Sequence, residues 1–296
     1  MTVYLCKKIN GAKFVDNCII ESKIYNKKLY RKSSLGKISP HYKTIGILNL
    51  MPNKVETEAH LLELFSKMNE DINIKFIRLK THVYKNCNRL YLMKNYYTFD
   101  EVKDDLDGLI VIGAPIEKID FKQVKYIDEL NYIFDYSIKN LKSMLSICWG
   151  AQACLNHIYG INKEILDKKI FGVYKHNILC DDEILKNINN GFICAHSRHT
   201  ILNRKDLKNC KSIKILSTTD EGIEHIIKGK YNDYYIFGHH EYDKECLKRE
   251  YLRDRNKKIY IDIPKNYFIE DDMNKGISVD WMEHSIKIYN NWINII

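Results

Sequence analysis

A cysteine at position 148 stands between two small residues, Ser146 and Gly150, in the stretch SICWGAQ. The apolar run SMLSI (143–147) comes directly before it, and a helical pattern begins directly after it. Small residues two positions away on each side allow a sharp strand-to-helix turn, which presents a nucleophile to its substrate. A helix N-terminus also favours the anionic form of a thiol. The pattern predicts Cys148 as a catalytic nucleophile; the alternative is a small apolar residue that fills the core.

A thiol nucleophile needs a base, because a cysteine with an ordinary pKa of about 8.5 is only a few per cent thiolate at neutral pH. The stretch YYIFGHHEYD (234–243) offers one, since an apolar strand is followed there by glycine and polar residues. In an extended backbone, His239 and Glu241 point to one side while His240 points to the other. Glu241 would then hold the tautomer of His239 and stabilise its imidazolium form. The alternative is a solvated surface turn.

The remaining cysteines and histidines carry weaker signals. Cys154 falls well inside the helix predicted after Cys148, next to Leu155, and we expect it to pack in the core. The nine cysteines include no C-x-x-C pair, which argues against a structural zinc site. The other metal candidates are His196, His199, His239 and His240. Their spacing matches no zinc motif, so we expect no metal.

Alternating strand and helix patterns must position these residues. Strands are predicted over 44–50, 72–79, 108–115 and 143–147, and helices over 55–68, over 124–141 and from just after Cys148. Mostly β-like runs follow at 170–176, 192–197, 213–218, 224–228 and 234–239, and two helical patterns close the chain at 243–255 and 280–293. Such alternation implies βαβ units and a mainly parallel α/β sheet. Ligands bind such sheets beyond the carboxyl ends of the strands, where Cys148 is predicted.

The chain of 296 residues suits one large α/β domain with an extension. Residues 1–43 do not join the alternation, and we expect an N-terminal extension packed on a domain of residues 44–296. Hydrophobic residues make up 45% and charged residues 29%, an ordinary balance for a globular protein.

Composition also bounds the partners and the location of the protein. No apolar run reaches the roughly 18 residues of a membrane helix, and the N-terminus lacks the apolar stretch of a secretory signal. Nine scattered cysteines without an export signal fit a reducing compartment better than a disulfide framework, so we expect a cytoplasmic protein. The net charge of +9 admits nucleic-acid binding, but the lysines are dispersed and no nucleic-acid motif is present. We expect neither a nucleic-acid nor a membrane partner.

SICWGAQ and GHHEYD together resemble the Cys-x-Gly-x-Gln elbow and the His-x-Glu pair of the class I glutamine amidotransferase-like fold. Further motifs occur in order: ILNLMPNKVETE (47–58), GLIVIGAPIEKIDF (108–121), CWGAQACLNHIYGI (148–161), GVYKH (172–176), AHSRH (195–199) and GHHEYD (238–243). The set, over roughly residues 40–290, resembles the homoserine O-acyltransferases of methionine biosynthesis, in their amidotransferase-like branch. The resemblance implies a three-layer α/β/α, flavodoxin-like fold and a homodimer.

The resemblance also implies residue roles. Cys148 matches an acyl-thioester nucleophile, His239 its proton acceptor and Glu241 the third member of the triad. The family's substrate-contacting positions are matched by Lys169, Ser197 and Arg253. Arg253 offers a bidentate fork for the α-carboxylate of homoserine, the alternative being a surface charge on an exposed helix. The chain departs from the family at His240, where the family most often has proline, which bears on the turn but not on a triad position.

The implied chemistry is acyl transfer in two steps, with acetyl-CoA and L-homoserine as small-molecule substrates and no cofactor. A CoA thioester exchanges to a thioester on Cys148, and the hydroxyl of homoserine then attacks it while His239 removes the proton. The tetrahedral oxyanion needs donors, for which we expect the backbone N–H of Trp149 and an N–H near Ile116.

Glu117, in GAPIEKIDF, bears on which acyl donor is used, because the resemblance places it at the family's position linked to donor choice. Members with Glu there resemble acetyl-CoA users, and those with Gly resemble succinyl-CoA users. A carboxylate near the acyl pocket opposes the distal carboxylate of a succinyl group, at a cost of about 4 kcal/mol at 4 Å for an effective dielectric near 20, or about 1 in bulk water. We therefore predict acetyl over succinyl; the alternative is a solvated loop residue.

Other functions remain open at this point. A homoserine O-succinyltransferase and a glutamine amidotransferase would use the same triad, and the amidotransferase needs a synthase domain or partner to consume its ammonia. A non-catalytic binding protein, with Cys148 as an inert or redox-sensing thiol, belongs to a different class. A serine acceptor in place of homoserine is also compatible with the sequence.

Overall fold

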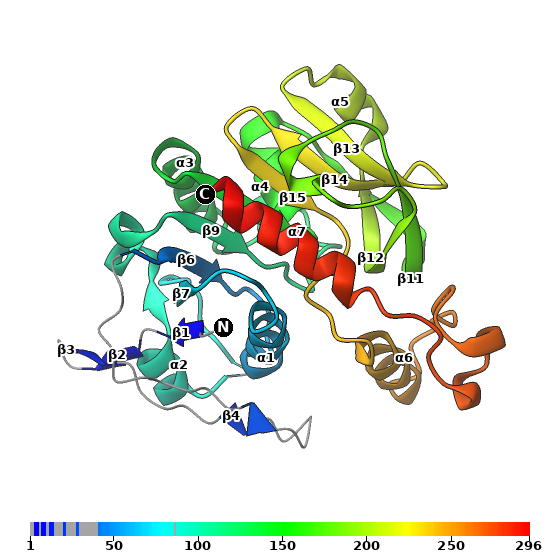
Figure 1. Ribbon diagram of the computed structural model, residues 1–296, viewed down its shortest axis with the longest axis horizontal. Helices are drawn as coiled ribbons and strands as arrows, with labels where there is room; N and C mark the ends of the chain where they lie inside the picture. Colours follow the sequence, from blue (N-terminus) through cyan, green and yellow to red (C-terminus); the bar gives the residue numbers. More distant parts are fainter. Residues whose placement is uncertain are drawn as a thin grey trace.

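The computed structural model describes residues 41–85 and 87–296, together with the backbone of five short strands before residue 30. A large sheet runs through the centre of the molecule, in the order β1-β7-β6-β9-β10-β15-β14-β13-β11-β12, with β8 beside β7 (Figure 1). Its strands are β1 Val3–Leu5, β6 Lys43–Leu48, β7 Ile72–Arg78, β8 Tyr97–Thr98, β9 Gly108–Val111, β10 Ser143–Ile147, β11 Lys163–Ile178, β12 Phe192–Leu202, β13 Ile213–Thr219, β14 Glu224–Gly229 and β15 Asp233–Ile236.

The sheet has a parallel half and an antiparallel half. From β1 to β15 every neighbouring pair is parallel, as the alternation of strands and helices predicts. From β15 to β12 every pair is antiparallel. Strands β11–β12, β13–β14 and β14–β15 are consecutive and turn back on each other, whereas β13 pairs with β11, two strands earlier in the chain. Outside this sheet, β2 Lys7–Ile9 pairs with β3 Ala12–Phe14, and β4 Ile20–Glu21 with β5 Lys28–Leu29.

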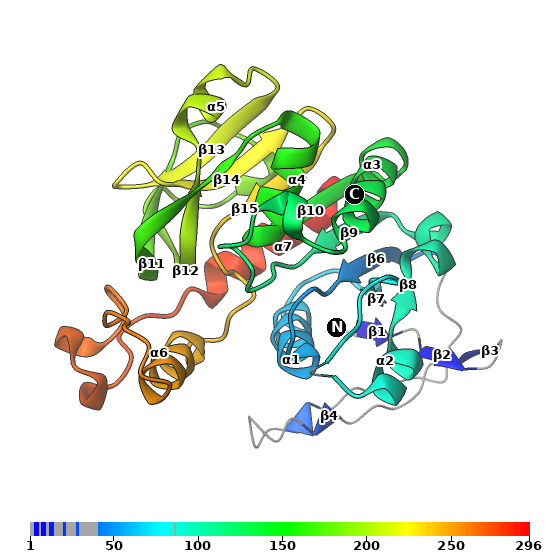
Figure 2. The same ribbon diagram turned by 180° about the vertical axis from the view of Figure 1, so that it is seen from behind.

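Helices cover both faces of the parallel half, which makes three layers. In Figures 1 and 2, α1 and α7 lie on one face and α3 and α4 on the other. The α-helices are α1 Lys54–Phe65, α2 Arg89–Asn95, α3 Ile127–Asn140, α4 Trp149–Tyr159, α5 Arg204–Asn209, α6 Cys246–Asn256 and α7 Met282–Ile295. Single 3-10 turns are η1 Phe99–Glu101, η2 Lys103–Asp105, η3 Phe121–Gln123, η4 Glu183–Leu185, η5 Ile269–Asp271 and η6 Met273–Lys275.

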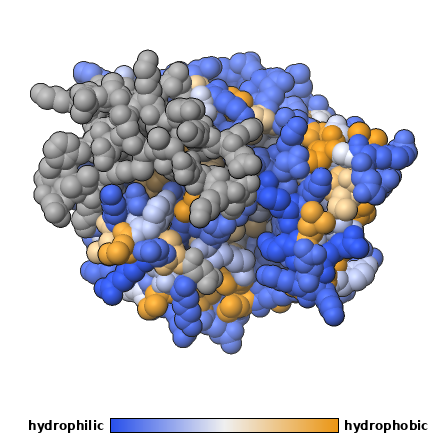
Figure 3. All heavy atoms as spheres, turned by 90° about the horizontal axis from the view of Figure 1, so that it is seen from below, coloured by the Kyte–Doolittle hydropathy of each residue, from blue (hydrophilic) through white to orange (hydrophobic). Residues whose placement is uncertain are grey.

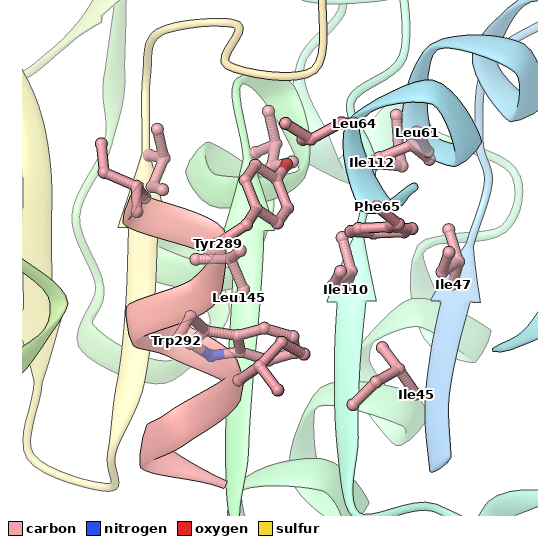
Figure 4. Packing of buried hydrophobic residues seen from close by; sticks show 14 of the residues in the cluster. Ile45, Ile47, Leu61, Leu64, Phe65, Ile110, Ile112, Leu145, Tyr289 and Trp292 are labelled. Carbon is pink, nitrogen blue, oxygen red and sulfur yellow. The ribbon is translucent and has the colours of Figure 1, made fainter. Parts of the chain in front are cut away.

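Two apolar cores follow from the alternation of side chains along each strand. Ile110 of β9 and Leu145 of β10 face the helices α1 and α7, where Phe65, Tyr289 and Trp292 pack against them (Figure 4). The intervening strand residues face α3 and α4 on the other side of the sheet. The strands are thus apolar on both faces and are held in place by both helical layers.

Two local differences from the sequence predictions have simple causes. The polar stretch before residue 98 contains the short helix α2, which Asn88 caps by accepting the amides of Leu90 and Tyr91. Strand β9 ends at Val111, before the predicted limit, because the chain then turns at a Gly-Ala-Pro sequence. The predicted N-terminal extension lies largely outside the described residues.

Surface character agrees with these elements. The face in Figure 3 is mostly hydrophilic where grey atoms do not cover it, and hydrophobic side chains form small separate groups. Among the described residues, no helix combines the length and apolar character needed to cross a membrane.

Candidate active site

The carboxyl ends of β10 and β15 bring Cys148 and His239 together. The two strands are parallel neighbours, with Ile147 opposite Ile236, and the amide of Cys148 donates to the carbonyl of Ile236 at 2.8 Å. The chain after β15 continues past β12, where the amide of His239 donates to the carbonyl of Ala195 at 2.7 Å. Residues separated by about ninety positions therefore meet at the edge where a parallel sheet binds ligands.

The backbone at Cys148 has the shape of a nucleophile elbow. Its φ is +50° and its ψ is −117°, outside the conformations that a non-glycine residue ordinarily adopts. Helix α4 begins at the next residue, so the thiol lies at a helix N-terminus. The turn has little room: a Cβ on Gly150 would lie 3.0 Å from the carbonyl oxygen of Val111. The predicted need for a small residue two positions after Cys148 is confirmed.

His239 and Glu241 form a hydrogen-bonded pair, with 2.8 Å between Nδ1 and Oε1. Both side chains are buried, and the ring of His239 stacks on Tyr242 with centroids 4.2 Å apart. The prediction that they point to one side is confirmed. A carboxylate accepts, so Nδ1 carries the proton, and Nε2 is left for the hydrogen bond between His239 and Cys148.

Opposing influences set the charge of His239. Burial is the largest and disfavours the imidazolium. The charges of Glu241 and Cys148, together with their hydrogen bonds, outweigh it and raise the pKa of His239 well above its ordinary value. An adjacent imidazolium is what a cysteine nucleophile needs.

Glu250, on helix α6, joins the predicted substrate-contacting residues. Its carboxylate accepts from Lys169 Nζ at 2.5 Å, from Ser197 Oγ at 2.9 Å and from Arg253 at 3.3 Å. Burial opposes its ionisation, but the charges of Lys169 and Arg253 and the hydrogen bonds lower the pKa of Glu250 below its usual value. The Glu250 carboxylate therefore joins Lys169 of β11, Ser197 of β12 and Arg253 of α6 into one cluster.

The sequence interpretation missed Glu250. The signal that could have found it is its position three residues before Arg253, which places both side chains on one face of a helix.

Arg253 is already engaged with acidic groups. Its Nε donates to Asp254 at 2.6 Å, and one terminal nitrogen donates to Glu250. The hydrogen bond to Asp254 is the largest influence and raises the pKa of Arg253 above its usual value. Burial opposes this shift, and the charge of Glu250 adds to it. About half of the side chain is exposed, so part of the guanidinium fork faces solvent.

Glu117 lies in the same neighbourhood. Its Oε1 accepts the amide of His199 at 3.0 Å, two residues beyond Ser197 on β12. Burial, the largest influence, raises the pKa of Glu117. The charges of Lys169 and His239 act in the opposite direction, which places this carboxylate within electrostatic reach of the base and of the Glu250 cluster.

The two predicted oxyanion donors differ in their availability. Trp149 begins α4, and its amide lies at the elbow. The amide of Ile116, however, donates to the carbonyl of Ala114 at 2.8 Å, so in this conformation it is used within its own turn. Gly113 is nearer, since a Cβ there would lie 3.3 Å from both Cys148 Cβ and Trp149 N. The turn that starts at Gly113 therefore lies closer to the elbow than the predicted position Ile116 suggests.

Cys154 has the predicted structural role. It is fully buried in α4, 3.5 Å from the hydroxyl of Tyr235, and burial raises the pKa of its thiol. A neutral, buried thiol is a core residue rather than a nucleophile.

A mainly parallel sheet between two layers of helices, with a Cys-His-Glu arrangement at the carboxyl ends of its strands, is typical of the class I glutamine amidotransferase-like fold. Solved structures of this fold include a glutamine amidotransferase from Thermotoga maritima, with a TM-score of 0.56, 7% identity, and coverage of 86% of this chain and 97% of that one. A glutamine amidotransferase from Methylobacillus flagellatus gives a TM-score of 0.55 with 9% identity, covering 86% and 95%. Identities this low establish the fold alone.

The family is fixed by sequence. A family model described as homoserine O-succinyltransferase matches residues 36–296. Homoserine O-acetyltransferases of Petrotoga mobilis and Acetivibrio thermocellus are each 44% identical over 253 residues, which cover 84% of this chain and 82% and 83% of theirs. The chain belongs to the homoserine O-succinyltransferase family and is an acyltransferase.

Proposed function

We propose that this enzyme transfers an acetyl group from acetyl-CoA to the hydroxyl of L-homoserine, through a thioester on Cys148. The observation that carries the mechanism is the arrangement of Cys148 at a strained elbow beside His239, whose Nδ1 is held by Glu241 at 2.8 Å. The acceptor rests on the names of the relatives, which are homoserine O-acetyltransferases. The proposal includes a cytoplasmic homodimer that needs no cofactor.

In the first step, the Cys148 sulfur attacks the carbonyl carbon of acetyl-CoA. A bond forms between this sulfur and the acetyl carbon, the bond to the CoA sulfur breaks, and CoA leaves with the proton from His239. The amide of Trp149 and the turn at Gly113 would stabilise the oxyanion. In the second step, the homoserine oxygen attacks the thioester, His239 takes its proton, and Cys148 leaves as the thiolate.

The same histidine serves both steps because its environment changes between them. In the free enzyme, burial lowers the pKa of His239, but the charges of Glu241 and Cys148 raise it by more, so the net pKa is high. Acylation removes the charge of Cys148, so the pKa of His239 falls. The imidazole is then neutral and able to accept the proton of homoserine.

Homoserine carries an ammonium and a carboxylate, which suit the Glu250 cluster. The exposed part of the Arg253 guanidinium suits the carboxylate of the substrate. The Glu250 carboxylate suits the ammonium, in competition with Lys169. This assignment agrees with the substrate-contacting roles that the resemblance gives to Lys169, Ser197 and Arg253.

The experiment that tests this proposal is a matrix of donors and acceptors with the purified full chain, read by release of the CoA thiol. Acetyl-CoA or succinyl-CoA is combined with homoserine or serine, and glutamine alone is the amidotransferase control. We expect the highest kcat/KM for acetyl-CoA with homoserine and no ammonia from glutamine. Ammonia release without CoA release would favour the amidotransferase instead.

Glu117→Gly is expected to raise the succinyl-to-acetyl ratio of kcat/KM at least about fivefold, since removing a like charge and bulk is worth about 1–4 kcal/mol. Because burial raises the pKa of Glu117, the carboxylate repels succinyl more strongly as pH rises through that pKa, so the preference of the unmodified enzyme for acetyl should grow with pH. Kinetics with both donors over a pH series measure this. Lys118→Gly, in the same loop and exposed, is the control. An unchanged donor ratio in Glu117→Gly removes Glu117 from donor selection.

A further inference from the structure

Four buried histidines converge behind the catalytic turn. They come from three strands and from the residue after His239, and they are His176 of β11, His196 of β12, His225 of β14 and His240. Nε2 of His176 lies 2.8 Å from Nε2 of His196, and Nε2 of His225 lies 3.1 Å from Nε2 of His240. Each side chain is at most 1% exposed. Ring nitrogens face one another at the centre of a buried cluster.

Outer hydrogen bonds orient three of the four rings. Nδ1 of His176 donates to the carbonyl of Phe192 at 3.2 Å. Nδ1 of His240 lies 3.1 Å from Oγ of Ser285, which itself donates to the carbonyl of Trp281, so it accepts from the imidazole. These bonds place the protons on Nδ1 and leave a lone pair on the inward Nε2. Histidine ligands of metals are usually held in this way.

The third ring, His225, is held similarly, with Nδ1 at 3.1 Å from Oγ of Ser217. Without a metal, the inward lone pairs of His176 and His240 need protons from His196 and His225. That assignment gives His196 a bare Nδ1, and this atom is buried with no hydrogen-bond partner among the described residues. A buried imidazole nitrogen left unpaired is a destabilising feature, and no protein group among the described residues satisfies it.

The protonation state of the cluster suits a cation. Burial, the largest influence, lowers the pKa of His176 to about 3 and holds the pKa values of His196, His225 and His240 well below their ordinary range. Neutral imidazole is the form that binds metals. The charge of Arg198 acts on His176, His196 and His225, and Glu224 lies 3.4 Å from Arg198 and offsets that charge.

We propose that this cluster binds one divalent cation of the zinc type, with His176, His196, His225 and His240 as its four imidazole ligands. The ligand atoms of His176, His196 and His225 all lie within 4.8 Å of one another, and those of Cys194, His225 and His240 form an overlapping set. Tetrahedral Zn–N bonds of about 2.0–2.1 Å place the nitrogens about 3.3–3.4 Å apart. The 2.8 and 3.1 Å separations need to widen by only a few tenths of an ångström. The two sets share only His225, so His240 must also move toward His176 and His196 for all four nitrogens to reach one ion.

The stacked rings must also rearrange on binding. The rings of His176 and His225 stack, with centroids 3.7 Å apart and planes at 28°. Their lone pairs converge on one ion only if the two rings splay further apart. The cluster is buried, so the ion enters while the domain folds rather than afterwards.

The site would stabilise the catalytic turn. A Cβ on Gly238 would lie 2.7 Å from the Cys194 sulfur and 3.0 Å from Nε2 of His225, so the turn before His239 rests directly on the cluster. A closed site with four protein ligands is structural rather than catalytic. Its role is to tie β11, β12 and β14 to the segment that carries His239 and Glu241.

The test measures zinc itself in the full chain. The protein is unfolded, freed of metal with a chelator, and refolded with and without Zn²⁺; bound zinc is then quantified by mass spectrometry and by competition with a chromophoric chelator. We expect one zinc per chain, a higher Tm with zinc, and at least tenfold weaker binding in His225→Gln and in His240→Gln. His157→Gln, in a histidine outside the cluster, should bind zinc like the unmodified chain.

Three results would overturn the proposal. One is the absence of stoichiometric zinc in the refolded chain. Another is equal zinc binding in His157→Gln and His240→Gln. His240→Gln keeps the proposal testable if His225→Gln does not refold. The third is a strong thiolate-to-metal band after Co²⁺ is substituted for zinc, since it would replace the four-imidazole set with one that contains Cys194.

Discussion

Cys148→Ala is expected to lower kcat for acyl transfer by about 10⁴-fold or more, because loss of a nucleophile that acts with its base removes the covalent route. Intact-protein mass spectrometry after mixing with acetyl-CoA alone should show one added acetyl group on the unmodified chain and none on Cys148→Ala. The rate of turnover is measured separately, from the CoA released in samples stopped at successive times. The two readouts separate the intermediate from turnover.

Cys154→Ala is the matched control, since it removes the same sulfur atom from a cysteine six residues further on, inside α4. Cys154 lies at the back of α4, against Tyr235, and has no part in the proposed chemistry. Its variant should acquire the acetyl group and keep activity of the same order, with some loss of stability from the cavity. A chain that turns over without ever carrying an acetyl group would falsify the covalent mechanism.

His239→Asn is expected to lower kcat by about 10³-fold, within the range for removal of a general base. In the unmodified enzyme, kcat should fall as pH drops through the pKa of His239 in the acyl-enzyme, since the protonated ring cannot accept the proton of homoserine. The variant should lose this acid limb. A pH series of kcat at saturating substrates, with single-turnover hydrolysis of the acyl-enzyme, measures both effects.

His157→Asn is the control for this prediction. His157 pairs with Asp135 on the far side of α4 and should leave both the rate and the acid limb in place. If His239→Asn retained the limb, another group would be the base. Rescue of the variant by added imidazole would support the assigned role, because the small base enters the space left by the ring.

Much of the fold was predictable because the responsible forces are local. Strand β10, Ser143–Ile147, was predicted with the bounds that the structure has, since its apolar run is closed by a charged residue before and an elbow after. The His239–Glu241 pair was predictable because alternation in an extended backbone fixes which residues share a side. The antiparallel half was less predictable, since its strands carry similar apolar patterns and their pairing depends on connections between them.

Of the candidate site, the sequence determined which residues are proposed for the chemistry: the elbow at Cys148 and the pair two residues apart at His239 and Glu241. Only the tertiary structure decided what surrounds them. Glu250 joins Lys169 and Ser197, and His240 joins three histidines from other strands, through contacts between residues far apart in the chain. Such contacts depend on strand order and register. The local hydrophobic pattern does not contain this information, because it shows which face of the sheet a side chain lies on but not which strand lies beside it.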